Sequence, residues 1–162
     1  MRSACGWIIA LCLLCAPSVH AASSSAPVEV SAVVVTNCQI VVSDLAFGTY
    51  DPLGANQNQQ LDGSAAVRVL CTRSASASIE IDAGQSGSAS SRSMTSGSQR
   101  VAYQLYRDSN RTRAWSGESD AIRFVSSSSR DSQQFTVYAR IPAGQQVPSG
   151  LYTDVVRATV YF

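Results

Sequence analysis

Hydrophobic and polar residues alternate with period two along most of the chain after residue 27, which is typical of strands that bury one face. Residues 28–38, VEVSAVVVTNC, are dense in β-branched residues and open this pattern. Further alternating segments follow, separated by turn residues, at 65–71, 77–83, 100–108, 133–141 and 152–162. Since no segment of this part carries the apolar stripe of an amphipathic helix, the pattern predicts an all-β sandwich of short strands.

Two regions depart from regular alternation. Residues 39–54, QIVVSDLAFGTYDPLG, predict a short strand followed by a turn at Asp51 and Pro52. Residues 84–99 are rich in serine and glycine and show no periodicity, so we expect a loop there.

The last segment raises the question of what covers its edge, because a long apolar edge strand recruits other chains. The strand at 28–35 of another copy is one answer: it would lie beside residues 152–162 and build an open, head-to-tail fibre. Alternatively, residues 28–35 are the first strand of a closed sandwich, and the pattern alone leaves both possibilities open. In the first case the donor row is Val28, Val30, Ala32 and Val34, and the acceptor row is Tyr152, Val156, Ala158, Val160 and Phe162.

Residues 1–21 have the composition of a secretory signal peptide. Met1 and Arg2 precede an apolar run at 7–15, which is too short to span a bilayer comfortably. Its removal leaves Cys38 and Cys71 as the remaining cysteines. Two cysteines in an oxidising compartment most simply pair, so we expect a disulfide between them.

Removal of the signal peptide also changes the charge and the available chemistry. The chain has 12 basic residues, all arginine, and 11 acidic ones, and Arg2 leaves with the signal, so the remaining charges balance. A balanced chain without a basic run gives no electrostatic footprint for nucleic acid. The single histidine, His20, leaves as well, and there is no lysine, so no ordinary base is left to activate a serine. We therefore expect no enzymatic activity.

Two smaller features of the sequence are possible sites. Glu80 and Asp82 share one strand face, which is more typical of a solvated surface than of a catalytic carboxylate pair. Trp115 follows Arg111 and Arg113, where it either packs in the core or contributes to a carbohydrate or cation–π site. We find no metal site, phosphate loop or cofactor fingerprint and expect no cofactor.

Four stretches, taken in order, resemble the landmarks of the spore coat protein U family, the subunit family of archaic chaperone–usher pili and related cell-surface coats. They are NCQIVVSDLAFGTYDPL, VRVLCT, RSMTSGSQRVAYQLYRDSNRTRAW and QQFTVYARIPAGQQVPSGLYTDVVRATVYF. The resemblance spans residues 28–162. It implies an incomplete immunoglobulin-like sandwich of six strands plus an N-terminal donor strand, with the seventh strand missing.

The resemblance also implies partners and roles. A periplasmic chaperone supplies the missing strand first, an outer-membrane usher exports the subunit, and the N-terminal extension of another pilus subunit supplies the strand in the fibre. The donor segment corresponds to residues 26–36, the acceptor strand to 151–162, and the family disulfide to Cys38 and Cys71. The shaft, adaptor and coat roles, and homo- or hetero-polymers, remain open.

We therefore expect a signal peptide at 1–21, a donor extension at 22–36 and a pilin-type sandwich at 37–162, in a subunit exported through the periplasm to the cell surface. We expect no nucleic-acid partner and no membrane span after signal cleavage. The alternative is a self-contained secreted sandwich that binds carbohydrate or surfaces through residues 111–115.

Overall fold

The computed structural model describes residues 21–162, so the expected signal peptide lies almost entirely outside the described residues. Residues 21–33 are extended and exposed and contain no strand or helix. The compact unit is Val34–Phe162. Within residues 21–162 no helix is long and apolar enough to cross a bilayer.

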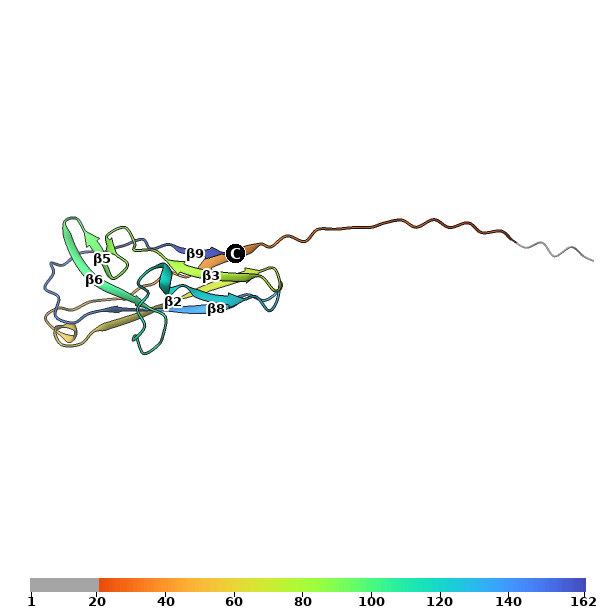
Figure 1. Cartoon of the computed structure of the whole chain (residues 1–162). Coiled ribbons are helices and arrows are strands. Elements are labelled where there is room, and N and C mark those ends of the chain that lie inside the picture. The colour runs from red at the N-terminus through yellow and green to blue at the C-terminus, as the bar shows by residue number, and fades with distance from the viewer. Residues whose placement is uncertain (1–20) are drawn as a thin grey trace, which may run out of the picture. The chain divides into compact units, whose positions relative to one another are not determined.

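Two antiparallel sheets build the compact unit (Figure 1). The larger sheet has the strand order β1-β2-β8-β6-β5-β4, and the smaller sheet has the order β7-β3-β9. The strands are β1 (Cys38–Val42), β2 (Leu61–Cys71), β3 (Ser76–Ile81), β4 (Gly87–Ser88), β5 (Ser91–Ser96), β6 (Gln99–Tyr106), β7 (Ile122–Val125), β8 (Gln133–Ile141) and β9 (Ala158–Tyr161). Single 3₁₀ turns occur at Ala55–Gln57 and Glu118–Asp120.

The core explains why these segments are strands. In β2 the residues Ala65, Val67, Val69 and Cys71 are buried while the residues between them are more exposed, and β3, β6 and β8 repeat this alternation. Side chains of both sheets meet in one apolar cluster. The strands expected around 65–71, 77–83, 100–108 and 133–141 are therefore confirmed.

Two expectations about secondary structure were wrong in part. Residues 84–99 are not a plain loop, because they contain β4 and β5. The last strand is shorter than expected, since only Ala158–Tyr161 pairs with a neighbour. Residues 28–37 pair with no strand of the same chain, so the structure does not make them the first strand of a closed sandwich. The short strand β7 was not anticipated; it pairs with β3.

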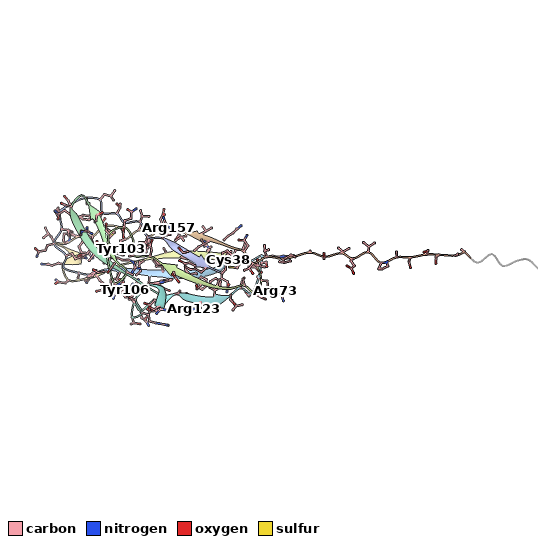
Figure 2. All side chains as sticks on the ribbon, turned by 45° about the horizontal axis from the view of Figure 1, so that its top comes forward. Cys38, Arg73, Tyr103, Tyr106, Arg123 and Arg157 are labelled. Carbon is pink, nitrogen blue, oxygen red and sulfur yellow. A yellow bond between two sulfur atoms is a disulfide. The ribbon has the colours of Figure 1, made fainter. Side chains whose placement is uncertain are left out.

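The expected disulfide is confirmed: Cys38 and Cys71 are bonded and are opposite each other in the β1–β2 ladder. We call this the disulfide end of the sandwich, and β3 begins and β9 finishes there as well. The opposite end, which we call the loop end, is built from residues 48–60, the β5–β6 turn and residues 142–151. Figure 2 shows Cys38 at the disulfide end and Tyr103 nearer the loop end.

Candidate functional site: a groove beside the last strand

A groove of about 520 Å³ opens between the segment that follows β1 and the segment that precedes β9. Its first wall is Val42, Ser43, Asp44, Leu45 and Phe47. Its second wall is Tyr152, Thr153, Asp154, Val155, Val156 and Ala158. Its floor consists of the core residues Ala65, Val67, Ile81, Met94, Tyr103, Leu105 and Val137. An apolar core is therefore open along one side.

Both walls keep a free backbone edge. The strand β1 pairs only with β2, and β9 pairs only with β3, among the described strands. Before β9 the second wall makes a single bridge, in which Thr153 exchanges backbone hydrogen bonds of 2.8 and 3.0 Å with Thr95. Unpaired N–H and C=O groups along an edge are a template for another strand.

Two aspartates hold the second wall in place although it has no continuous ladder. One carboxylate oxygen of Asp154 accepts a hydrogen bond from the Gln85 amide at 2.9 Å, and the other accepts from the Tyr103 hydroxyl at 2.7 Å. The carboxylate of Asp82 accepts from the Arg157 amide at 2.9 Å, and the Asp82 amide donates to the Arg157 carbonyl at 3.0 Å. These bonds tie the wall to the end of β3 and to the floor.

Tyr103 links the groove floor to this wall. Burial raises the pKa of the Tyr103 hydroxyl well above its ordinary value, and the hydrogen bond to the carboxylate of Asp154 raises it further. Tyr103 is therefore a neutral donor at any physiological pH, and it satisfies the carboxylate that faces the groove.

Arg92 is a fully buried cation that contacts the end of β3, to which the second wall is tied. Its guanidinium donates to the carbonyls of Ala89 at 2.6 Å, Trp115 at 2.8 Å and Asp82 at 2.7 Å, and to the side chain of Gln104 at 2.9 Å. Burial lowers the pKa of Arg92, but arginine remains protonated in proteins. The charge is compensated by oriented carbonyls, which fixes the β4–β5 hairpin against the end of β3.

The residues of the two alternative sites make other contacts. Trp115 is fully buried, so the core interpretation of this residue is confirmed. Arg111 lies 3.2 Å from the carboxylate of Asp62 and stacks over the ring of Tyr138 at 5.6 Å from its centroid. The carboxylate of Asp82 accepts hydrogen bonds from the backbone amides of Gly84 and Arg157. Within residues 21–162 no three histidine, cysteine or acidic residues cluster as a metal site would require.

The structure divides the acceptor row. Tyr152, Val156 and Ala158 line the groove. Val160 is opposite Ile79 in the β3–β9 ladder and packs on the core, and Phe162 lines a separate hollow at the disulfide end. The donor row Val28, Val30, Ala32 and Val34 is exposed, its valines by 82 to 91%.

Sequence reasoning missed the first wall and the role of Asp154. Leu45 and Phe47 alternate with polar or small residues in the first wall, which was a usable signal. Both side chains pack over Gly63 of β2, where an added Cβ would lie 3.1 Å from Phe47 and 3.4 Å from Leu45. The local sequence pattern does not indicate that Leu45 and Phe47 approach Gly63 this closely, because the contact joins residues distant in the chain.

Within residues 21–162 the fold is an incomplete, all-β immunoglobulin-like sandwich in which the Cys38–Cys71 disulfide joins β1 to β2. A solved structure shares it: "Crystal structure of CsuC-CsuE chaperone-tip adhesion subunit pre-assembly complex from archaic chaperone-usher Csu pili of Acinetobacter baumannii", with a TM-score of 0.54 and 22% identity. The match covers 80% of this chain and 40% of the other, so this chain spans less than half of that protein's length.

Sequence comparison gives the family. Protein U of Myxococcus xanthus is 34% identical over 129 residues, which are 73% of this chain and 71% of that protein. The family model of the Spore Coat Protein U domain matches residues 24–159. The chain belongs to the Spore Coat Protein U domain family, as the sequence resemblance implied.

Proposed function

We propose that this chain is an exported structural subunit of a chaperone–usher pilus or surface coat, and that it polymerises by donor-strand complementation. In this assembly the groove of one copy accepts the N-terminal segment 26–36 of another. A periplasmic chaperone occupies the groove before assembly, and an outer-membrane usher passes the subunits to the cell surface. In this proposal the chain carries out no catalysis and consists of a signal peptide at 1–21, the donor extension at 22–36 and the sandwich at 37–162.

The groove carries this proposal. It has an apolar floor and two free backbone edges, which are the features that strand addition uses: main-chain hydrogen bonds give affinity and alternate side chains enter pockets. The donor row offers three valines and one alanine on one face of seven residues, a length of about 23 Å as a strand. Burial of these four side chains would contribute roughly 4–8 kcal/mol.

The direction of the donor follows from the ends of the sandwich. The second wall runs from the loop end to the disulfide end, and the first wall runs the opposite way. Residues 35–37, from which the extension departs, are at the disulfide end, where Thr72 donates hydrogen bonds to the carbonyls of Val35 and Asn37. In a fibre whose copies all point the same way, the donor enters the next groove at its loop end, antiparallel to residues 152–158.

The comparisons support the proposed partners. The solved structure of the same fold is named as a chaperone–subunit complex of an archaic chaperone–usher pilus. This resemblance in fold makes a periplasmic chaperone the natural first occupant of the groove. The carbohydrate-binding alternative is weakened because Trp115 is buried and Arg111 already has partners.

The test is a ladder of oligomers on unheated denaturing gels that collapses on boiling. We expect the full chain, expressed with its chaperone and usher, to give this ladder, and deletion of residues 22–34 to abolish it. Deletion of residues 22–25, which precede the donor row, is the matched control and should keep the ladder. An unchanged ladder after the longer deletion would contradict the proposal.

A second experiment uses the predicted direction. Residues 26–36 appended after Phe162 through a short turn would fold back as a hairpin, because the donor runs antiparallel to the second wall. This fusion, also lacking residues 22–34, should be a soluble monomer without chaperone. A fusion in which Val30 and Val34 are replaced by aspartate is the control and should aggregate, because it would bury unpaired charges.

A further inference from the structure

Arg157 is the one residue of 152–158 that does not line the groove. It lies on the stretch that leads into β9 (Figure 2). Its neighbours Val156 and Ala158 line the groove and pack on the core, so the alternation of an extended segment turns the Arg157 side chain to the outer surface, where it is exposed. The salt bridges within residues 21–162 do not include Arg157, so its charge has no partner in this part of the chain.

The backbone of Arg157 points away from the groove. Its amide donates to the carboxylate of Asp82 at 2.9 Å, and its carbonyl accepts from the Asp82 amide at 3.0 Å. Successive residues of a strand direct these groups to opposite sides, so Val156 and Ala158 direct theirs to the free edge. In an antiparallel donor the residue opposite Arg157 would therefore form a non-hydrogen-bonded pair with it, which is the kind of pair in which side chains are closest, with Cα atoms about 4.5 Å apart.

The donor extension carries a single charge. Glu29 is the only charged residue of 22–37, and it is exposed in the free chain. It lies between Val28 and Val30 of the donor row, so insertion of that row into the groove turns the Glu29 side chain to the outer surface. The outward rows of the donor and of the second wall therefore bring opposite charges to the same face.

The length of the groove limits how the donor can be aligned. The inward row of residues 152–158 has four members, Tyr152, Asp154, Val156 and Ala158, and the donor row also has four, over the same span of seven residues. In an antiparallel strand, Val28 opposite Ala158 places Val34 opposite Tyr152. This alignment keeps the whole donor row inside the groove, and it places Glu29 directly opposite Arg157.

We infer that an ion pair between Glu29 of one copy and Arg157 of the copy that accepts its strand sets this alignment. The inference rests on the proposed function and adds the register of the two partners. An ion pair is needed for this purpose, because a displacement by two residues keeps the apolar face of a strand inward. Opposite charges directly across a strand pair stabilise it, and like charges destabilise it.

The two displaced registers lose both features. Displacement by two residues toward the disulfide end places Glu29 against Thr159 and leaves Tyr152 without a donor side chain. Displacement toward the loop end places Glu29 against Val155 and moves Val34 beyond the groove. The charge and the groove length therefore favour the same register independently.

Exchange of the two charges tests the ion pair in assembled fibres. Glu29→Arg alone and Arg157→Glu alone should each lower the temperature at which the heat-sensitive ladder collapses, by about 2–4 °C. The double variant should regain the temperature of the unmodified fibres. This recovery is the decisive readout, because Glu80 and Asp82 share the outer face with Arg157 and would repel a glutamate there without any donor contact.

The matched control combines Glu29→Arg with Arg123→Glu. Arg123 is exposed on β7, at the other edge of the smaller sheet, and this variant has the same net charge as the charge exchange. Its ladder should collapse at the lower temperature of Glu29→Arg. A charge exchange at Glu29 and Arg157 without recovery, or equal recovery in the control, would overturn the ion pair.

Paired cysteines report the register directly. Glu29→Cys with Arg157→Cys in one chain should give a ladder that survives boiling without reductant. Two controls represent the displaced registers, Ser31→Cys with Arg157→Cys and Glu29→Cys with Val155→Cys, and they should give several-fold less covalent product.

The outcomes separate the register from the proposed function. More covalent product in either control, or none in the three variants while the heat-sensitive ladder persists, overturns the register and leaves donor-strand assembly standing. If the unmodified chain forms no heat-sensitive ladder, or if the ladder survives deletion of residues 22–34, the proposed function fails and the register fails with it.

Discussion

Gly84 lies against Asp154 of the second wall. Replacing Gly84 therefore tests whether Asp154 keeps this wall in place. Gly84 has φ +77°, and a Cβ at this position would collide with one carboxylate oxygen of Asp154 and lie 3.0 Å from its Cγ. The Gly84→Ala variant must therefore displace the carboxylate from its donors, Tyr103 and Gln85.

Two free-energy contributions determine how much stability the Gly84→Ala variant loses. A left-handed conformation costs a non-glycine residue about 1–2 kcal/mol. Loss of hydrogen bonds to a charged carboxylate costs about 1.5–3 kcal/mol more. Gly97→Ala is the matched control, since Gly97 has φ +59° with nothing within 4 Å of the added Cβ, so only the first term applies.

The assay is unfolding of the assembled protein in guanidinium chloride, followed by the fluorescence of the buried Trp115. With a slope of about 4 kcal/mol per molar, the second term should lower the midpoint of Gly84→Ala by roughly 0.5 M more than that of Gly97→Ala. Equal midpoints in the two variants would refute the view that Asp154 holds the wall.

Three further predictions concern the disulfide, the buried tyrosine and the donor row. Replacing both Cys38 and Cys71 by serine should lower the free energy of unfolding by about 4 kcal/mol in the chain-entropy model, as measured by chemical denaturation, since the bond closes a loop of 33 residues. Folding raises the pKa of Tyr103, so the neutral hydroxyl contributes fully to stability below pH about 10. Above that pH the free energy of unfolding should fall by up to about 1.4 kcal/mol per pH unit. The Tyr103→Phe variant should lack this fall in stability at alkaline pH. Val30→Asp should abolish the heat-sensitive ladder, because it would bury a charge, whereas Val33→Asp, on the opposite face, should preserve it; loss of the ladder in both would exclude the proposed face.

The sequence correctly predicted the strands that have one face in the core and the other face exposed. Residues 65–71 alternate cleanly because Val67 and Val69 are buried while Arg68 is exposed. The same period-two signal located β3, β6 and β8. It also indicated an open edge at the end of the chain, but it could not show where pairing begins, because residues 154–157 have no strand partner within the compact unit.

The missed features depend on contacts between distant residues. The β4–β5 hairpin was read as a loop because Arg92 occupies a buried position where the pattern expects an apolar side chain. Its charge is tolerated only because the carbonyls of Asp82 and Trp115 converge on it. The first wall of the groove was missed for a similar reason, since Phe47 packs over Gly63 across a turn of the chain.

The most direct test of donor-strand assembly is cysteine cross-linking between copies. One chain carries Val156→Cys in the second wall, and a co-expressed chain carries a single cysteine at Val30, Ser31, Ala32 or Val33. The account predicts cross-linked dimers from Val30 and Ala32, which face the groove, and none from Ser31 or Val33. Cross-linking without this alternation, or a variant with Val30→Cys and Val156→Cys in one chain that oxidises only within a single copy, would contradict it.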